Sequence, residues 1–221
     1  MIDVIYLAAG QGKRAKLGYP KQFARLGGKP IMVHALEVFQ SMSEIRRIII
    51  ACADIVKTES VLNPYGIKKA RCVQGGKTRQ ESVQKALEHV KTENVLIHEA
   101  VRPFITEEFV KEIIAVNRQA VTPWKPAIST VISIDGKCHD RSRFGEVQMP
   151  QKYTSTLLEC AYEKAESYII QSSTDDADLL NKAMLVNPYV IPGLEENIKI
   201  TTPLDLVIAE AIYQARFRNG E

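Results

Sequence analysis

Two cations beside a glycine-rich segment give this sequence its clearest chemical signal. Arg14 and Lys21 follow residues 8–12, a run of alanines and glycines broken by one glutamine. Backbone N–H groups can approach an anion closely in such a loop, and the two cations are spaced to reach the same phosphates. The pattern therefore predicts a nucleoside triphosphate site. A solvent-exposed loop with ordinary surface charges is the alternative for the glycines alone, and the nearby Pro-Lys-Gln-Phe segment makes it less favourable.

Two better-known phosphate motifs do not fit this segment. A P-loop needs Gly-x-x-x-x-Gly-Lys followed by Ser or Thr, but Lys13 is followed by Arg14, and Leu7 stands where the first glycine belongs. The dinucleotide fingerprint Gly-x-Gly-x-x-Gly fails as well, because position 15 is alanine. The site is therefore expected to belong to another class of nucleotide-binding protein.

The elements that position these residues alternate between strand and helix. Apolar, β-branched runs indicate buried strands, and apolar residues at helical spacing indicate the helices between them. Strands are expected at residues 2–7, 45–52, 71–73 and 94–97, and helices at 30–42, 56–62, 78–90 and 106–119. This order is typical of a mostly parallel sheet with helices on both faces.

The alternation stops after residue 120. Residues 131–134, followed by Asp135-Gly136, predict a hairpin or projecting arm. Helices are expected again at 156–169, 175–184 and 203–217, with a last strand near 197–200. We therefore expect a single domain over residues 1–221, with an inserted arm at about 131–150.

Polar clusters follow several of the predicted strands. The first is the glycine-rich loop, the second begins at Gly75-Gly76, the third contains Glu99 and Arg102, and Lys199 lies on the last strand. In open α/β sheets, ligands bind in the crevice beyond the carboxyl ends of the strands. The clusters should therefore converge on one site.

Composition and cysteine usage exclude several other classes of protein. A net charge of +3, without a basic stripe, gives no reason to expect nucleic acid, and no apolar run is long enough to span a bilayer. The four cysteines and the histidines lack the spacing of metal ligands, so they predict neither a zinc site nor a disulfide framework. We expect a cytoplasmic protein that binds neither nucleic acid nor membrane.

Six motifs in order resemble those of the cytidylyltransferases that activate polyol phosphates with CTP. They are AAGQGKR, PKQF, GGKTRQESV, HEAVRP, the pair Pro150-Gln151 and NIKITTPLDL, and they cover almost the whole chain. The resemblance implies a three-layer, Rossmann-like nucleotidyltransferase fold with a projecting β-arm. It also implies transfer of CMP from CTP to a polyol phosphate with Mg²⁺ or another divalent cation.

The resemblance assigns roles to residues on the CTP side of the site. Arg14 and Lys21 would lie against the triphosphate and stabilise the charge that develops during transfer. The implied nucleotide-binding residues are Ala8, Ala9, Gly10, Gly12, Gly75, Gly76, Lys77 and Ser82. For Ser82, the alternative is a hydroxyl that bonds only to backbone groups on the first turns of the following helix.

The resemblance also assigns residues to the acceptor side. The implied substrate-binding residues are Glu99, Arg102, Thr130, Arg141, Asp175 and Lys199. Asp175 or its neighbour Asp176 would be the acid of the substrate pocket, with a helix N-cap as the equal alternative. Arg141 lies on the arm, which in the family reaches the neighbouring subunit's site, so a homodimer is expected.

Three departures from the family pattern concern the acceptor. Glu99 replaces the usual Asp, Met149 replaces a Thr, and the stretch between Thr130 and Arg141 is short. We expect 2-C-methyl-D-erythritol 4-phosphate, an isoprenoid precursor, as the acceptor. Ribitol 5-phosphate or another alditol phosphate is the alternative. Two further alternatives are a nucleotidyltransferase that uses another base and a nucleotide-binding protein without activity.

Overall fold

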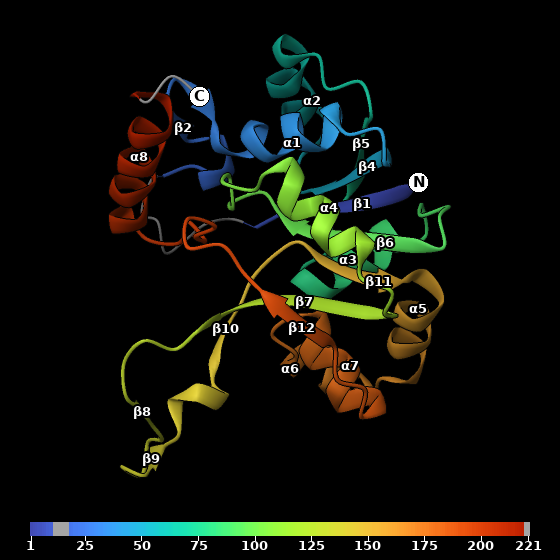
Figure 1. Cartoon of the computed structure of the whole chain (residues 1–221). Coiled ribbons are helices and arrows are strands. Elements are labelled where there is room, and N and C mark those ends of the chain that lie inside the picture. The colour runs from blue at the N-terminus through green and yellow to red at the C-terminus, as the bar shows by residue number, and fades with distance from the viewer. Residues whose placement is uncertain (11–17, 219–221) are drawn as a thin grey trace.

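An eight-stranded sheet forms the centre of the computed structural model, which describes residues 1–10 and 18–218 (Figure 1). The strands run in the order β10-β7-β11-β6-β1-β4-β5, and β12 pairs with β7. The strands are β1 (Ile2–Ala8), β2 (Arg25–Leu26), β3 (Lys29–Pro30), β4 (Ile45–Cys52), β5 (Ala70–Gln74), β6 (Asn94–Glu99), β7 (Ala120–Pro126), β8 (Val131–Ile132), β9 (Cys138–His139), β10 (Gly145–Val147), β11 (Gln151–Thr154) and β12 (Tyr189–Pro192). The α-helices are α1 (Ile31–Ser41), α2 (Ile55–Leu62), α3 (Arg79–Leu87), α4 (Glu107–Ala115), α5 (Ser155–Lys164), α6 (Ser167–Ser172), α7 (Asp176–Met184) and α8 (Pro203–Arg218), and 3₁₀ turns are η2 (Lys21–Phe23), η3 (Asn63–Tyr65) and η4 (Arg141–Arg143).

Alternating apolar side chains of the central strands divide the core into two layers. In β1, Val4 and Tyr6 pack with α1, α2 and α4, whereas Ile5 and Leu7 pack with α3, α5 and α7. Figure 1 shows these helices on the two sides of the sheet. Strands β5, β4, β1 and β6 pair in parallel, so their carboxyl ends share one edge. The expected three-layer α/β fold is confirmed.

The second half of the sheet differs from the expectation. Strand β11 lies antiparallel between β6 and β7, and β12 runs parallel to β7. The strand expected near residues 197–200 was wrong. The backbone N–H groups of Asn197 and Ile198 donate only to nearby residues of the same segment, and Ile200 makes a single backbone bond to Val101 instead of a ladder. The helix expected at 156–169 is divided between α5 and α6, with Ala165 and Glu166 extended between them.

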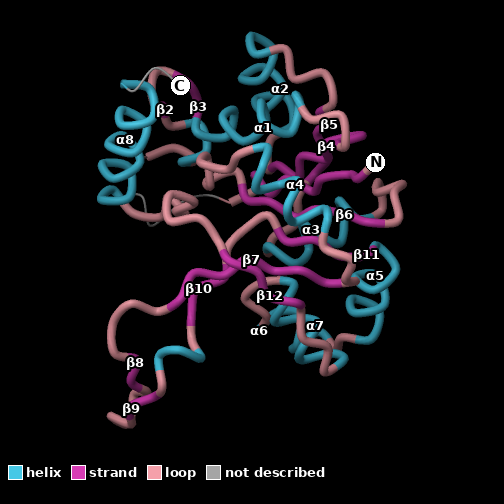
Figure 2. Tube along the Cα trace, in the orientation of Figure 1, coloured by secondary structure: helices cyan, strands magenta, loops and turns pink. Residues whose placement is uncertain are grey.

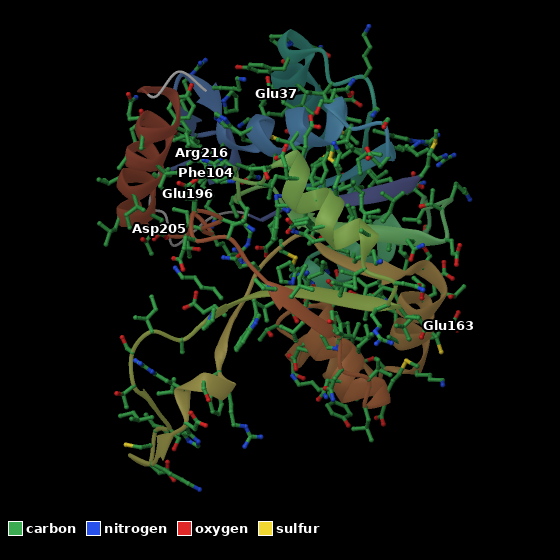
Figure 3. All side chains as sticks on the ribbon, in the orientation of Figure 1. Glu37, Phe104, Glu163, Glu196, Asp205 and Arg216 are labelled. Carbon is green, nitrogen blue, oxygen red and sulfur yellow. The ribbon has the colours of Figure 1, made fainter. Side chains whose placement is uncertain are left out.

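Side chains fix the segment between β12 and α8. The Gln148 amide bonds to both backbone groups of Leu194, and the Asn197 amide donates to Met149 O at 2.6 Å. Figure 3 shows Glu196, Arg216 and Phe104 together beside α8, where Arg216 Nε lies 2.6 Å from the Glu196 carboxylate. These contacts place Lys199 near the carboxyl end of β6 without a strand around it.

Residues 127–144 project from the sheet as an arm (Figures 1 and 2). Strands β8 and β9 form its tip, and the turn between them closes with a backbone bond from Ser133 to Lys137 and with Gly136 at φ +83°. Ile128, Ile132 and Ile134 are exposed on this arm. The hairpin expected after residue 130 is therefore present.

Candidate functional site

A pocket of 820 Å³ opens at the shared carboxyl edge of β1, β4, β5 and β6. The loops that follow these strands form its walls, as the positions of the polar clusters predicted. Its lining includes ten of the expected site residues, namely Ala8, Ala9, Gly10, Lys21, Gly75, Gly76, Lys77, Ser82, Glu99 and Lys199. Arg14 and Gly12 were also expected here, but they lie outside the described residues.

The turn after β5 is held by hydrogen bonds from the first turn of α3. Thr78 caps this helix by accepting from Glu81 N at 3.1 Å, and Glu81 accepts in return from Lys77 N at 2.7 Å. The Ser82 hydroxyl accepts from Gly76 N at 3.0 Å and donates to Thr78 O at 2.8 Å. Ser82 therefore bonds to backbone groups, as the alternative expectation held, while it also lines the pocket.

The two glycines of this turn are required by close packing. A Cβ on Gly75 would lie 2.6 Å from the Ala9 Cβ, and one on Gly76 would lie 2.2 Å from the Glu81 Cβ. The turn after β5 thus packs directly against the loop after β1. A base bound here would face backbone groups instead of side chains at this wall.

Lys21 is fixed at the pocket by its neighbour in η2. The Gln22 amide donates to Ala8 O at 2.7 Å, which ties η2 to the end of β1. Lys21 itself is buried and lines the pocket. The second cation of the sequence motif is therefore held on the same wall as the alanines of the first loop.

Glu99, the last residue of β6, is surrounded by three cations. Its carboxylate lies 2.7 Å from Lys199 Nζ, 3.1 Å from Arg102 Nε and 4.0 Å from Arg79 Nε. Burial alone would raise the pKa of Glu99, but these positive charges outweigh it and lower the pKa from 4.5 to about 2. Glu99 is therefore an anion that orients the cations around it.

Arg102, which we expected to bind the substrate, lies behind the pocket and is not part of its lining. It is buried, and besides Glu99 it donates to Asn197 O at 2.9 Å and Val147 O at 3.3 Å. A turn closed by the backbone bond from Arg102 N to Glu99 O follows β6, and the guanidinium reaches the segment that carries Lys199. Arg102 thus links the end of β6 to this segment.

Asp175 does not line the pocket either. It is the N-cap of α7, accepting from Asp178 N at 2.9 Å, and it also accepts from the Gln151 amide at 2.9 Å. The next residue, Asp176, is fully buried, and its carboxylate lies 2.7 Å from Arg79 Nη2. The helix-cap alternative therefore describes Asp175, and the buried acid is Asp176.

Sequence reasoning missed Arg79 as a site residue. Arg79 is the first residue of α3, lines the pocket and lies between Asp176 and Glu99. Its position inside the GGKTRQESV motif was the available signal. The contact with Asp176 depends on how α7 docks against α3, which no local pattern specifies.

Thr130 and Arg141 lie on the arm and do not line this pocket. Both are exposed, and Arg141 donates to Ile128 O within the arm. Met149 is buried outside the pocket lining. A single chain therefore does not bring these three residues to the site.

The charges that line the pocket favour an anionic ligand. Its cations are Lys21, Lys77, Arg79, Lys85 and Lys199, and its carboxylates are Glu81 and Glu99. Among the described residues, no group of three or more His, Cys, Asp or Glu is placed to hold a metal ion. Mg²⁺ commonly binds through substrate phosphates with one or two carboxylates and several waters. This pocket therefore suits a cation that arrives on the phosphates of the ligand.

Comparisons with known proteins agree with this geometry. The family described as 2-C-methyl-D-erythritol 4-phosphate cytidylyltransferase matches residues 2–215. An enzyme of that name from Alkaliphilus metalliredigens is 38% identical, with 100% of this chain and 95% of the relative covered. A solved 4-diphosphocytidyl-2C-methyl-D-erythritol synthase from Anaerococcus prevotii is 28% identical, with a TM-score of 0.81 and coverage of 97% and 96% of the two chains.

A relative with a different printed activity also matches. The bifunctional ribulose 5-phosphate reductase/CDP-ribitol pyrophosphorylase Bcs1 of Haemophilus influenzae is 32% identical. The match covers 96% of this chain and 48% of that relative. This relative is less similar to the chain than the Alkaliphilus metalliredigens enzyme, so the match does not favour the ribitol alternative.

No helix in the described part of the chain is long and apolar enough to cross a membrane.

Proposed function

The chain belongs to the 2-C-methyl-D-erythritol 4-phosphate cytidylyltransferase family, and we propose that it transfers CMP from CTP to 2-C-methyl-D-erythritol 4-phosphate. The products are a CDP-polyol for isoprenoid precursor synthesis and pyrophosphate. The observation that carries the proposal is one cationic pocket in which Lys21, the Gly75-Gly76 turn and Lys199 meet.

The reaction needs two anions to be held in line. A phosphate oxygen of the acceptor attacks the α-phosphorus of CTP, and the bond to the pyrophosphate breaks. Such transfer depends on positioning and electrostatic stabilisation more than on covalent chemistry. Lys21, with Arg14 from the same motif, would stabilise the charge that builds on the α-phosphate and the leaving pyrophosphate.

The nucleotide would lie between the first loop and the turn after β5. Backbone groups of Ala8, Gly76 and Lys77 would face the cytosine, and Ser82 would support the turn through its bond to Gly76 N. A divalent cation such as Mg²⁺, bound mainly by CTP phosphates, would neutralise phosphate charge. Ala9, Gly10, Gly12 and Gly75 would provide the close approach of the backbone.

The acceptor would lie on the side of Glu99 and Lys199. Lys199 would bind its phosphate, and Glu99 would accept from a polyol hydroxyl. Arg102 would act from behind by holding the segment that carries Lys199. Asp175, by capping α7, would fix the neighbouring wall of the site.

The arm is proposed to join two chains in a homodimer and to complete the partner's acceptor site through Thr130 and Arg141. Its exposed isoleucines and its distance from its own pocket lining support this role. The four cysteines are free thiols, which suits a reducing compartment such as the cytoplasm.

A pyrophosphate-release assay with CTP and a panel of polyol phosphates tests this function. We expect turnover with 2-C-methyl-D-erythritol 4-phosphate and much lower kcat/KM with ribitol 5-phosphate. Preference for ribitol 5-phosphate would reverse the acceptor assignment. Thermal stabilisation by CTP should exceed that by UTP or GTP, and CTP binding without turnover on any acceptor would indicate a protein without activity.

A further inference from the structure

A buried ion pair joins the first residues of α3 and α7. Arg79 Nη2 lies 2.7 Å from Asp176 Oδ2, and the side chain of Asp176 has no exposed surface. The other carboxylate oxygen accepts from the Tyr162 hydroxyl at 2.8 Å. Because removing two charges from water is costly, a buried pair is weak evidence for a contribution to stability. The pair therefore calls for a role other than holding the fold together.

The arginine of this pair faces the pocket, whereas the aspartate lies behind it. Arg79 lines the pocket, and its Nε lies 4.0 Å from the Glu99 carboxylate. Its three guanidinium nitrogens are shielded from solvent, and one of them lies at ion-pair distance from Asp176. The guanidinium is therefore held between two carboxylates.

The attachment of α7 to α3 fixes the backbone around the pair. The Gln80 amide, one residue after Arg79, donates to Ser173 O just before α7. Asp175 caps α7 and bonds to Gln151, which in turn accepts from the Tyr153 hydroxyl at 2.8 Å. The positions of both backbones are thus set independently of the ion pair, which leaves the pair to determine where the Arg79 side chain lies.

We propose that Asp176 and Arg79 form a positioning pair, in which Asp176 holds the Arg79 guanidinium beside Glu99 and so orients Glu99 toward the acceptor. This inference rests on the proposed function and adds to it. With Asp176 present, Arg79 is shared between two carboxylates, and Glu99 keeps its contact with Lys199. Without Asp176, Arg79 turns to Glu99 and competes with Lys199 for the same carboxylate oxygen, Oε1. Acceptor binding would therefore be weaker, while the turn after β5, on the CTP side of the pocket, keeps its own hydrogen bonds.

The central test compares Michaelis constants for the two substrates in Asp176→Asn. We expect KM for the polyol phosphate to rise about tenfold or more, because small displacements of substrate-positioning groups are costly. KM for CTP should stay within about twofold of wild type, because the bonds of Thr78, Glu81 and Ser82 remain. Arg79→Met should also raise KM for the polyol phosphate. Arg79→Lys, which keeps the charge, should raise this KM less than Arg79→Met does.

Two further variants separate positioning from folding. Tyr162→Phe removes the hydroxyl bond to Asp176 but keeps both charges, so its KM values should match wild type even where its Tm falls. The paired variant Arg79→Met with Asp176→Leu removes both buried charges, so its Tm should approach that of wild type. Its acceptor KM should remain raised, because Glu99 then lacks the guanidinium that orients it, although Lys199 no longer has a competitor.

The positioning role would be overturned by an equal rise of both Michaelis constants in Asp176→Asn. A normal acceptor KM in the paired variant would also overturn it. If wild type released no pyrophosphate with the polyol phosphate, the proposed function would fail together with this inference. If wild type were active and Asp176→Asn matched it, the positioning pair alone would be rejected.

Discussion

The ammonium group of Lys199 lies 2.7 Å from the Glu99 carboxylate, and this contact joins β6 to the segment before α8. Glu99 is held by Arg102 on its other oxygen, at 3.1 Å. An acceptor phosphate that binds Lys199 must therefore share the ammonium group with Glu99.

Replacing Lys199 should weaken acceptor binding selectively. We expect Lys199→Gln to raise KM for the polyol phosphate about tenfold to a hundredfold, because a hydrogen bond to a charged group contributes about 1.5–3 kcal/mol. CTP-induced thermal stabilisation should be unchanged. Lys111→Gln, on the exposed face of α4 where Lys111 pairs with Glu107, is the control and should behave as wild type. Equal losses for both substrates would contradict the placement of Lys199 on the acceptor side.

Replacing Lys21 should slow the chemical step. Removing one preorganised charge from the reacting phosphates typically lowers kcat about a hundredfold to a thousandfold. Lys21→Gln should show this loss in single-turnover pyrophosphate release at saturating CTP, with a Tm close to wild type. A variant with raised KM for CTP and unchanged kcat would instead show that Lys21 binds ground state and transition state equally.

The Gly75-Gly76 turn should tolerate no side chain. In Gly76→Ala the new Cβ would lie 2.2 Å from the Glu81 Cβ, so α3 or the turn must move. We expect a loss of about 1–3 kcal/mol in the free energy of unfolding and a reduced thermal shift with CTP. Gly10→Ala is the matched control for stability, because its Cβ meets no described atom within 4 Å. Equal stability of the two variants would contradict the packing argument.

The parallel half of the fold was predictable because its central strands are buried on both faces. Residues 48–52 form a continuous apolar run after two arginines, and β4 has the predicted bounds, 45–52. Strand β7 was not predicted, because its prolines at 123 and 126 argue against a strand. It is a strand nonetheless, because β10, β11 and β12 pair with it. Such pairing is determined by tertiary structure.

The site, like the fold, could be predicted in part. The position of Lys21, Gly76 and Ser82 at the pocket was predictable, because loops after parallel strands meet at one edge of the sheet. The ion pair of Asp176 was not predictable, because it depends on a contact between α3 and α7, which lie far apart in the sequence. The two neighbouring aspartates look alike in sequence, and only helix docking makes one a cap and the other a buried ion.

Mixing subunits would test the role of the arm. If Arg141 acts in the partner's site, Lys21→Gln and Arg141→Ala homodimers are both inactive, but a heterodimer of the two contains one site with neither change. A heterodimer purified through two different tags should therefore have about half of the wild-type activity, as expected for a two-fold symmetric dimer. If each arm served its own pocket, both sites of the heterodimer would be defective and it would be as inactive as its parents. A monomeric wild type in light scattering would also contradict the exchange.

Stability below neutral pH should depend on His98, which lies behind Glu99 in β6. Its Nε2 donates to Arg102 O at 3.0 Å, its ring packs against Tyr6 and Phe39, and its Nδ1 has no partner within the described residues. Burial lowers the pKa of His98 from 6.5 to about 4. The unfolded chain therefore binds a proton between pH 6.5 and 4 that the native protein does not, so stability falls as the pH is lowered through this range. The free energy of unfolding lost through this group is about 3 kcal/mol, because each pKa unit of the shift corresponds to about 1.4 kcal/mol.

His98→Gln keeps an amide donor for Arg102 O and cannot gain the proton. In urea unfolding at pH 7, 5.5 and 4, its stability should fall less steeply than that of wild type, and parallel curves would show that His98 is not the group that titrates.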